Sequence, residues 1–512
     1  MDVAEPPPGH APALPTREQG GVRETLGDMS APAVATRPHV AVVGGGIAGL
    51  SAATEVLAAL PDASVTLLEG SDRLGGKLRL ESVAGHAVDV GAEAMLALRP
   101  EAVDLVRRVG AEDDLVTPAT TSASVWTRGR LRPLPRATLM GVTTDPEAAR
   151  GILTDDEVAR ARDERPWPGG VVTDDVSVGD YVGTRLGAAV VDRLVEPLLG
   201  GVYAGHAARL SLRATMPAVW AKAVTGERLT EQPAAAQAPA GGSASPGRPV
   251  FAGLRGGVGR LPGLLADALR DRGAELRTSA VVRGLERTGT GWRLVVGSAA
   301  SPESVEADAV VLCVPPAPAA RLLRPHAPAA ADRLDEVETA STAVVTLAVE
   351  RRGLGQLPGS GFLVPPVEGR TIKASTFSAA KWEWTGELSD EVVHLRASLG
   401  RAREEAALQR EDTELVAVSV AEVSEALGGR LPRVVDAHVQ RWGGGLPQYA
   451  VGHVERMAAV RDAVAGLPGV HVAGAAYDGV GIPAVVSSAT AAARAATEHL
   501  RTVTIPSREA SR

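Results

Sequence analysis

A glycine-rich turn near the start of the chain is the first group of residues whose spacing predicts chemistry. Gly44-Gly45-Gly46-Ile47-Ala48-Gly49 follows a short apolar run and opens a stretch of small residues typical of a helix. In this spacing the first glycine permits a tight turn, the second lets a pyrophosphate approach the backbone, and the third allows close helix packing. Glu69 ends the next apolar run, where a carboxylate accepts hydrogen bonds from ribose hydroxyls. We therefore predict a dinucleotide site on free amides at a helix start.

Two further motifs follow in order, and a third lies near the other end of the chain. They are Arg73-Leu74-Gly75-Gly76-Lys77, then Asp89-Val90-Gly91-Ala92-Glu93, and finally the small-residue stretch 472–483, which precedes a helix rich in Ala and Ser. Together these motifs resemble the flavoprotein family that includes monoamine oxidases, phytoene desaturases and protoporphyrinogen oxidases. The resemblance implies non-covalent FAD, with the amides of the last helix near the reactive ring.

The resemblance assigns cofactor contacts to particular residues. It implies that the glycine turn and Glu69 hold the ADP half, that Val282 holds the adenine through its backbone, and that Trp442 lies against the flavin. For Val282 the alternative is an ordinary strand residue, and for Trp442 a core tryptophan. The predicted cofactor-binding residues are Gly44, Gly45, Gly46, Ile47, Ala48, Gly49, Glu69, Gly70, Lys77, Gly91, Ala92, Glu93, Ala94, Val282, Trp442, Val480, Gly481 and Ile482.

Longer stretches resemble one branch of that family, the porphyrinogen oxidases of haem biosynthesis. These stretches are residues 177–182, 195–205, 251–261, 442–449 and 475–483. The bacterial coproporphyrin-dependent type is most similar, which implies oxygen-dependent, six-electron oxidation of coproporphyrinogen III to coproporphyrin III with hydrogen peroxide formed, and transient contact with a ferrochelatase. Protoporphyrinogen IX as substrate, an amine oxidase, a carotenoid desaturase, and a non-catalytic porphyrin-binding flavoprotein remain open alternatives.

Oxidation of a porphyrinogen needs little from protein side chains beyond shape and charge. A bridging methylene loses hydride to the flavin and a pyrrole nitrogen loses a proton, so no nucleophile is required. The protein must supply an apolar slot and cations for propionates. The resemblance nominates Arg99 as a bidentate propionate clamp, the alternative being a solvated arginine at a helix start. Glu93 stands where relatives have Arg or Asp, and His453 is assigned no role.

Composition excludes several other classes of protein. The 53 basic and 61 acidic residues give a net charge of −8, which provides no general attraction for nucleic acid. A single cysteine, Cys313, excludes a disulfide framework, and its apolar surroundings predict a buried strand residue. The chain shows neither signal-peptide features nor an apolar run of about 18 residues that predicts a membrane span. We expect a cytoplasmic protein without a transmembrane segment or a metal site.

The expected fold is α/β, with a Rossmann-like FAD-binding domain interleaved with an α+β substrate domain and a helical subdomain. Alternating runs around 344–349 and 392–399 predict an antiparallel substrate sheet. The expected order is a disordered tail (1–37), FAD-binding segment (38–95), helical and substrate subdomain (96–225), low-complexity loop (226–250), second FAD-binding segment (251–330), antiparallel sheet (331–435), C-terminal FAD-binding segment (436–500) and tail (501–512).

Overall fold

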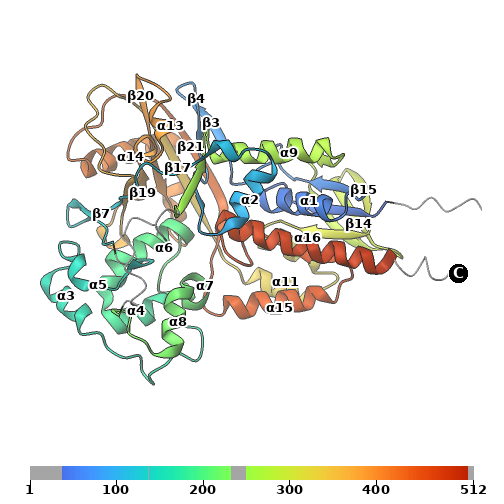
Figure 1. Ribbon diagram of the computed structural model, residues 1–512, viewed down its shortest axis with the longest axis horizontal. Coiled ribbons are helices and arrows are strands. Elements are labelled where there is room, and N and C mark those ends of the chain that lie inside the picture. Colours follow the sequence, from blue (N-terminus) through green and yellow to red (C-terminus); the bar gives the residue numbers. More distant parts are fainter. Residues whose placement is uncertain (1–36, 137, 232–248, 505–512) are drawn as a thin grey trace, which may run out of the picture. The chain divides into compact units, whose positions relative to one another are not determined.

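The structure is a computed structural model that describes residues 37–136, 138–231 and 249–504 (Figure 1). The expected N-terminal tail up to residue 36, most of the loop 226–250 and the last eight residues lie outside this part of the chain. The fold is α/β with a parallel sheet, as the sequence predicts. Among the described helices, none combines the length and apolar character needed to cross a membrane.

Five parallel strands form the sheet that carries the glycine turn. The central strand β1 pairs with β2 on one side and β16 on the other. Val40 and Val42 of β1 pack into one core, and Ala41 and Val43 pack into a second core on the opposite face. Both faces of the sheet are therefore buried, which explains why β1 is continuously apolar. The strands in sheet order are β12 (Glu275–Arg277), β2 (Ser64–Leu68), β1 (His39–Val43), β16 (Ala309–Leu312) and β22 (Val470–Val472).

Helices cover one face of this sheet, and a small sheet with three helices covers the other. The first and last helices of the described chain, α1 and α16, pack side by side (Figure 1). The helical face comprises α1 (Ile47–Ala59), α2 (Pro100–Arg108), α9 (Leu261–Asp271) and α16 (Ile482–Thr504). The other comprises β13 (Val282–Arg287), β14 (Trp292–Ser298), β15 (Ser301–Ala307), α10 (Pro316–Leu323), α11 (Pro328–Asp335) and α15 (His453–Ala465).

A seven-stranded sheet lies against α14 (Asp412–Ala426) and forms a separate core. Its pairs are antiparallel, as predicted, except that β18 and β7 run parallel. The hairpin β7–β8 was not predicted, since it arises from a region expected to be mainly helical. Arg128 and Gly129 at its turn both have positive φ, 52° and 77°, which is the conformation of a tight two-residue hairpin turn. In order, the strands are β21 (Val434–Pro447), β17 (Thr339–Glu350), β20 (Val392–Leu399), β19 (Ile372–Thr376), β18 (Gly361–Leu363), β7 (Ser124–Thr127) and β8 (Arg130–Pro133).

Short helices build a third region around a core of their own. Ser177 caps α4 by accepting a hydrogen bond from Asp180 N, and the buried Glu164–Arg185 ion pair joins the α3–α4 connection to α4. The helices are α3 (Asp155–Arg162), α4 (Val178–Leu186), α5 (Ala188–Val190), α6 (Glu196–Tyr203), α7 (Leu212–Thr215) and α8 (Pro217–Thr225), with a π-helical stretch at Val191–Val195.

The remaining elements are short connectors. They are β3 (Leu80–Val83), β4 (His86–Asp89), β5 (Met95–Leu96), β6 (Leu115–Val116), β9 (Thr138–Leu139), β10 (Val142–Thr143), β11 (Phe251–Leu254), α12 (Ser378–Lys381), α13 (Glu383–Gly386) and the 3-10 turns Glu112–Asp114, Pro146–Ala149, Val258–Arg260, Pro366–Glu368 and Glu405–Gln409.

Candidate active site

A cavity of about 870 Å³ reaches from the parallel sheet to the seven-stranded sheet. Val43 and Leu68, the last residues of β1 and β2, line one part, where ligands bind in open α/β sheets. Residues of β17, β18, β19 and β20 line another part, and α6 contributes Gly201 and Val202. A single cavity therefore joins the predicted dinucleotide site to the predicted substrate sheet.

The glycine turn has the geometry that its spacing predicts. Gly44 adopts φ +106°, and a Cβ there would lie 2.5 Å from the carbonyl oxygen of Cys313. A Cβ at Gly49 would lie 1.8 Å from the Gly44 oxygen, so only glycine allows α1 to pack this closely. A Cβ at Gly46 would meet nothing closer than 3.9 Å and would extend into the cavity. Because no side chain caps α1, its first amides are available to a phosphate.

Backbone amides of the glycine turn and of the loop after β2 fix the position of the Glu69 carboxylate. Its Oε2 accepts a hydrogen bond from Gly45 N at 2.6 Å, and its Oε1 accepts one from Ser71 N at 2.8 Å. The carboxylate also lines the cavity. Since each carboxylate oxygen can accept more than one hydrogen bond, Glu69 keeps acceptor capacity for a sugar hydroxyl.

The C-terminal turn at 474–482 is braced from behind by Tyr449 and His453. The Tyr449 hydroxyl donates to Ala475 O at 2.6 Å and accepts from Gly479 N at 2.8 Å. The His453 ring stacks on Tyr449 at 3.8 Å between ring centroids, and His453 Nε2 donates to Ala476 O at 2.9 Å. Burial lowers the pKa of His453 to about 4, so the imidazole is neutral. The sequence analysis assigned neither residue this role, because the partners of Tyr449 and His453 lie more than twenty positions further along the chain.

Trp442 and Lys77 meet at Gly91, between the two ends of the cavity. Trp442 Nε1 donates to Val90 O at 3.2 Å, and a Cβ at Gly91 would lie 3.2 Å from the Trp442 ring. Burial lowers the pKa of Lys77, and among the described residues nothing hydrogen-bonds its amine or pairs with it. This amine faces the cavity and is available to an anionic part of a ligand.

Glu93 belongs to a buried network of charges that the sequence did not reveal. Its carboxylate lies 2.7 Å from Lys381 Nζ and 2.7 Å from Arg396 Nη1, and it accepts from Ser378 Oγ at 3.1 Å. Burial by itself would raise the pKa of Glu93, but the two cations lower it to about 2. Cations from α12 and β20 thus compensate the charge of the Glu93 carboxylate.

The cavity fits a bound dinucleotide. Cβ atoms at Gly46, Gly474 and Gly481 would have no protein atom within 3.8 Å and would project into space that a ligand needs. All predicted cofactor residues except Gly45 and Gly49 line the cavity, namely Gly44, Gly46, Ile47, Ala48, Glu69, Gly70, Lys77, Gly91, Ala92, Glu93, Ala94, Val282, Trp442, Val480, Gly481 and Ile482. Gly45 and Gly49 instead pack against Glu69 and Gly44.

Two predictions from the sequence need correction. Arg99 is not among the residues that line the cavity, because its guanidinium pairs with Glu101, two residues further on at the start of α2. Cys313 is not a buried strand residue: it follows β16, which ends at Leu312, it is only partly buried, and it lines the cavity. Burial raises the pKa of the Cys313 thiol to about 12. No group of three or more His, Cys, Asp or Glu suited to a metal ion occurs among the described residues.

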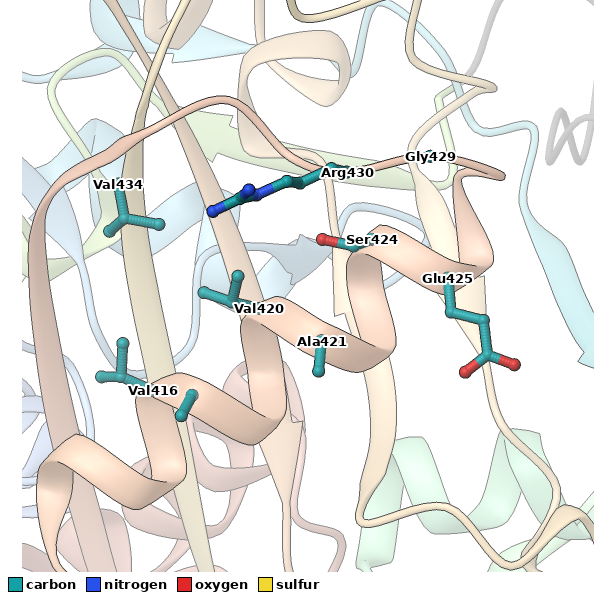
Figure 2. A pocket seen from close by; sticks show the side chains of 9 residues that line it. Val416, Val420, Ala421, Ser424, Glu425, Gly429, Arg430 and Val434 are labelled. Atoms are coloured by element: carbon teal, nitrogen blue, oxygen red, sulfur yellow. The ribbon is translucent and has the colours of Figure 1, made fainter.

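A second hollow, of about 640 Å³, lies between α14 and β21 (Figure 2). Figure 2 shows Val416 and Val420 of α14 near Val434 of β21, while the Glu425 carboxylate points away from them. Glu425 pairs with Arg370 at the surface. Of the polar residues that line this hollow, Ser424 accepts a hydrogen bond from Leu431 N and Glu425 pairs with Arg370, so we place the functional site in the larger cavity.

Comparison with known proteins identifies the family. Residues 47–497 match the family of flavin-containing amine oxidoreductases. The coproporphyrinogen III oxidase of Mycobacterium tuberculosis is 37% identical over 468 residues, which cover 90% of this chain and 97% of the relative. The coproporphyrinogen III oxidase of Bacillus subtilis is 28% identical over 483 residues, which cover 91% of this chain and 99% of the relative.

Solved structures agree with this result. A candidate protoporphyrinogen oxidase from Exiguobacterium sp. 255-15 superposes with a TM-score of 0.78 at 30% identity, covering 91% of this chain and 99% of its own. A putrescine oxidase variant shares the fold: it superposes with a TM-score of 0.64 at 16% identity, and the match covers 91% of this chain and all of the other. The chain therefore belongs to the flavin-containing amine oxidoreductase family, in the group of the coproporphyrinogen III oxidases, and is a flavin-dependent oxidoreductase.

Proposed function

We propose that this protein is an FAD-dependent coproporphyrinogen III oxidase of haem biosynthesis. Coproporphyrinogen III loses six electrons and six protons to become coproporphyrin III, while three molecules of oxygen are reduced to hydrogen peroxide. The observation that carries the proposal is the match to coproporphyrinogen III oxidases along 90% of the chain. The proposal places the reaction in the cytoplasm and includes transient contact with ferrochelatase for product transfer.

The proposed cofactor contacts follow the cavity. The glycine turn and Glu69 bind the ADP half, and Val282 borders the adenine, while Lys77 and residues 91–94 border the ribityl and pyrophosphate region. Trp442 and the turn at 480–482 border the ring. When bound, FAD accepts the hydride that leaves a bridging carbon and returns the electrons to oxygen.

The chain's own residues shape the substrate side. Leu363, Val344 and Val202 give this wall an apolar surface that excludes water from the macrocycle. The ion pairs with Lys381 and Arg396 compensate the negative charge of Glu93 where it lines the cavity.

We also propose that three segments, 38–95, 251–330 and 436–500, make up the FAD-binding domain. The parallel sheet supports this division, since its strands come from all three segments. The segments 96–225 and 331–435 then make up the substrate side. β21 crosses the expected boundary at 436, because it pairs with β17 up to Pro447.

Turnover of defined substrates tests the function. Porphyrin fluorescence and hydrogen peroxide are followed with coproporphyrinogen III, protoporphyrinogen IX and putrescine, and the flavin band is followed after anaerobic mixing. We expect bleaching of the flavin and the highest kcat/KM with coproporphyrinogen III. A preference for protoporphyrinogen IX, turnover of the amine alone, or binding of porphyrin without bleaching would each replace the proposal by the corresponding alternative.

The cofactor site is tested by Gly46→Asp, which puts a carboxylate where a pyrophosphate would approach. We expect colourless protein without bound FAD. Gly355→Asp is the matched control, because a Cβ there has nothing within 4 Å and its backbone is not in the left-handed region. A yellow Gly46→Asp protein with full FAD content would refute the assigned site.

A further inference from the structure

One lysine on the sheet side of the cavity has no partner. Lys373 lies in β19, where the pairing with β20 passes from Ile372–Leu399 to Ala374–Ser398 and leaves Lys373 in a β-bulge. Its side chain lines the cavity although only 4% of the residue is exposed. Within the described part of the chain, no residue forms a hydrogen bond or ion pair with its amine.

A second buried cation lies close to Lys373. Arg401 is 5% exposed and donates to Val364 O at 2.8 Å, while its nearest carboxylate, that of the half-exposed Glu404, is 3.9 Å away. Burial, and in second place the charge of Arg401, lowers the pKa of Lys373 to about 7. Two neighbouring buried cations with so little compensation are costly unless an anion joins them.

The other cations of the cavity are already engaged or lie elsewhere. Lys381 and Arg396 are both ion-paired with Glu93, which compensates one of their two charges, and Arg321 donates to Val282 O on the adenine side. Lys77 lies next to Gly445 and Gly91 on the proposed flavin side. Of the four lysines in this arginine-rich sequence, Lys77, Lys373 and Lys381 line the cavity. Among the described residues, Lys373 is thus the basic residue on the substrate wall whose amine has neither a hydrogen bond nor an ion pair and is available to a ligand.

We propose that Lys373, with the charge of the neighbouring Arg401 adding to its own attraction for an anion, binds a carboxylate of the substrate and so orients the macrocycle in the cavity. The proposal rests on the proposed function, in which the substrate carries propionates, and it gives to Lys373 the role that the sequence had assigned to Arg99. An ammonium group with three donors can follow a flexible propionate, and it makes a charge-assisted hydrogen bond in a dry site.

The test compares Lys373→Met, Lys373→Arg and the control Lys222→Met, all as flavin-loaded protein. Lys222 lies on α8 and bonds to the carbonyls of Arg228 and Glu231, outside the cavity. For coproporphyrinogen III we expect Lys373→Met to raise KM about 10- to 100-fold with kcat little changed. Lys373→Arg should recover most of this loss, and Lys222→Met should behave as the wild type.

Two further measurements separate carboxylate binding from a structural role. The tetramethyl ester of coproporphyrinogen III has no carboxylate, so wild type and Lys373→Met should bind it equally. Ligand-free Lys373→Met should melt at or above the wild-type temperature, because it removes an unpaired buried cation. An unchanged KM, an equal loss with the ester, a fall in kcat alone, or a lower melting temperature would overturn the proposal.

Failure of the proposed function would look different. Wild-type protein would then turn over neither porphyrinogen, whereas failure of the Lys373 proposal leaves wild-type turnover intact and the variant unaffected. Fluorescence titration with coproporphyrin III gives a dissociation constant that does not depend on turnover. Lys373→Met should weaken this binding by a similar factor, and equal affinity of the two proteins would refute the assignment.

Discussion

The buried network around Glu93 leads to a quantitative prediction for Glu93→Gln. The side chains of Glu93, Lys381 and Arg396 are only 11%, 20% and 11% exposed, so removing the carboxylate leaves two cations poorly solvated. Breaking a buried ion pair in this way costs about 3 to 5 kcal/mol. With an unfolding entropy of about 2.1 cal/mol/K per residue, a unit of the size of 38–512 loses about 3 to 5 °C in melting temperature.

The assay is thermal unfolding of the flavin-loaded protein at pH 7, followed by circular dichroism and by flavin release. The cations lower the pKa of Glu93 from 4.5 to about 2. The stabilisation is therefore fully present above pH 4.5 and is lost as the pH falls through about 2, so pH 7 measures all of it. Glu101→Gln is the matched control, because its pair with Arg99 is 26% and 42% exposed and should contribute about 1 kcal/mol or less. Equal melting temperatures for the two variants would refute the reasoning.

Two other groups around the cavity give predictions of their own. Tyr449→Phe removes the acceptor for Gly479 N and the donor to Ala475 O. An unsatisfied amide costs about 1 to 2 kcal/mol, so the variant should bind flavin about 5- to 30-fold more weakly, as measured by fluorescence titration of the apoprotein. Unchanged affinity would show that Tyr449 does not hold the turn at 474–482 in its flavin-binding conformation. Cys313 is partly buried and lines the cavity, and desolvation raises the pKa of its thiol to about 12. The thiol should therefore react slowly with a disulfide reagent at pH 8 until the protein is unfolded, and rapid reaction of the folded protein would contradict the raised pKa.

The parts of the fold that were predicted correctly are those encoded by neighbouring residues. β1, α1 and β2 follow each other within thirty positions, and the apolar periodicity and glycine spacing are read without knowledge of the rest of the chain. The hairpin β7–β8 was missed because its strands are four residues long and complete a sheet whose other strands lie beyond residue 338. Arg99 was assigned to a propionate from its position after a motif, whereas in the structure it pairs with Glu101 at the partly exposed start of α2.

By itself, the sequence determined the backbone of the proposed cofactor end of this protein: a glycine turn at a helix start, an acidic residue after the second strand and a small-residue turn before the last helix. Backbone geometry at such turns depends on residues next to one another, so it can be inferred locally. Only the tertiary structure decided the charges of the site. Glu93 meets Lys381 and Arg396 from 288 and 303 positions further along the chain, and a bulge places Lys373 on the cavity. Electrostatic pairing depends on distance in space and on burial, and neither is encoded by spacing along the chain.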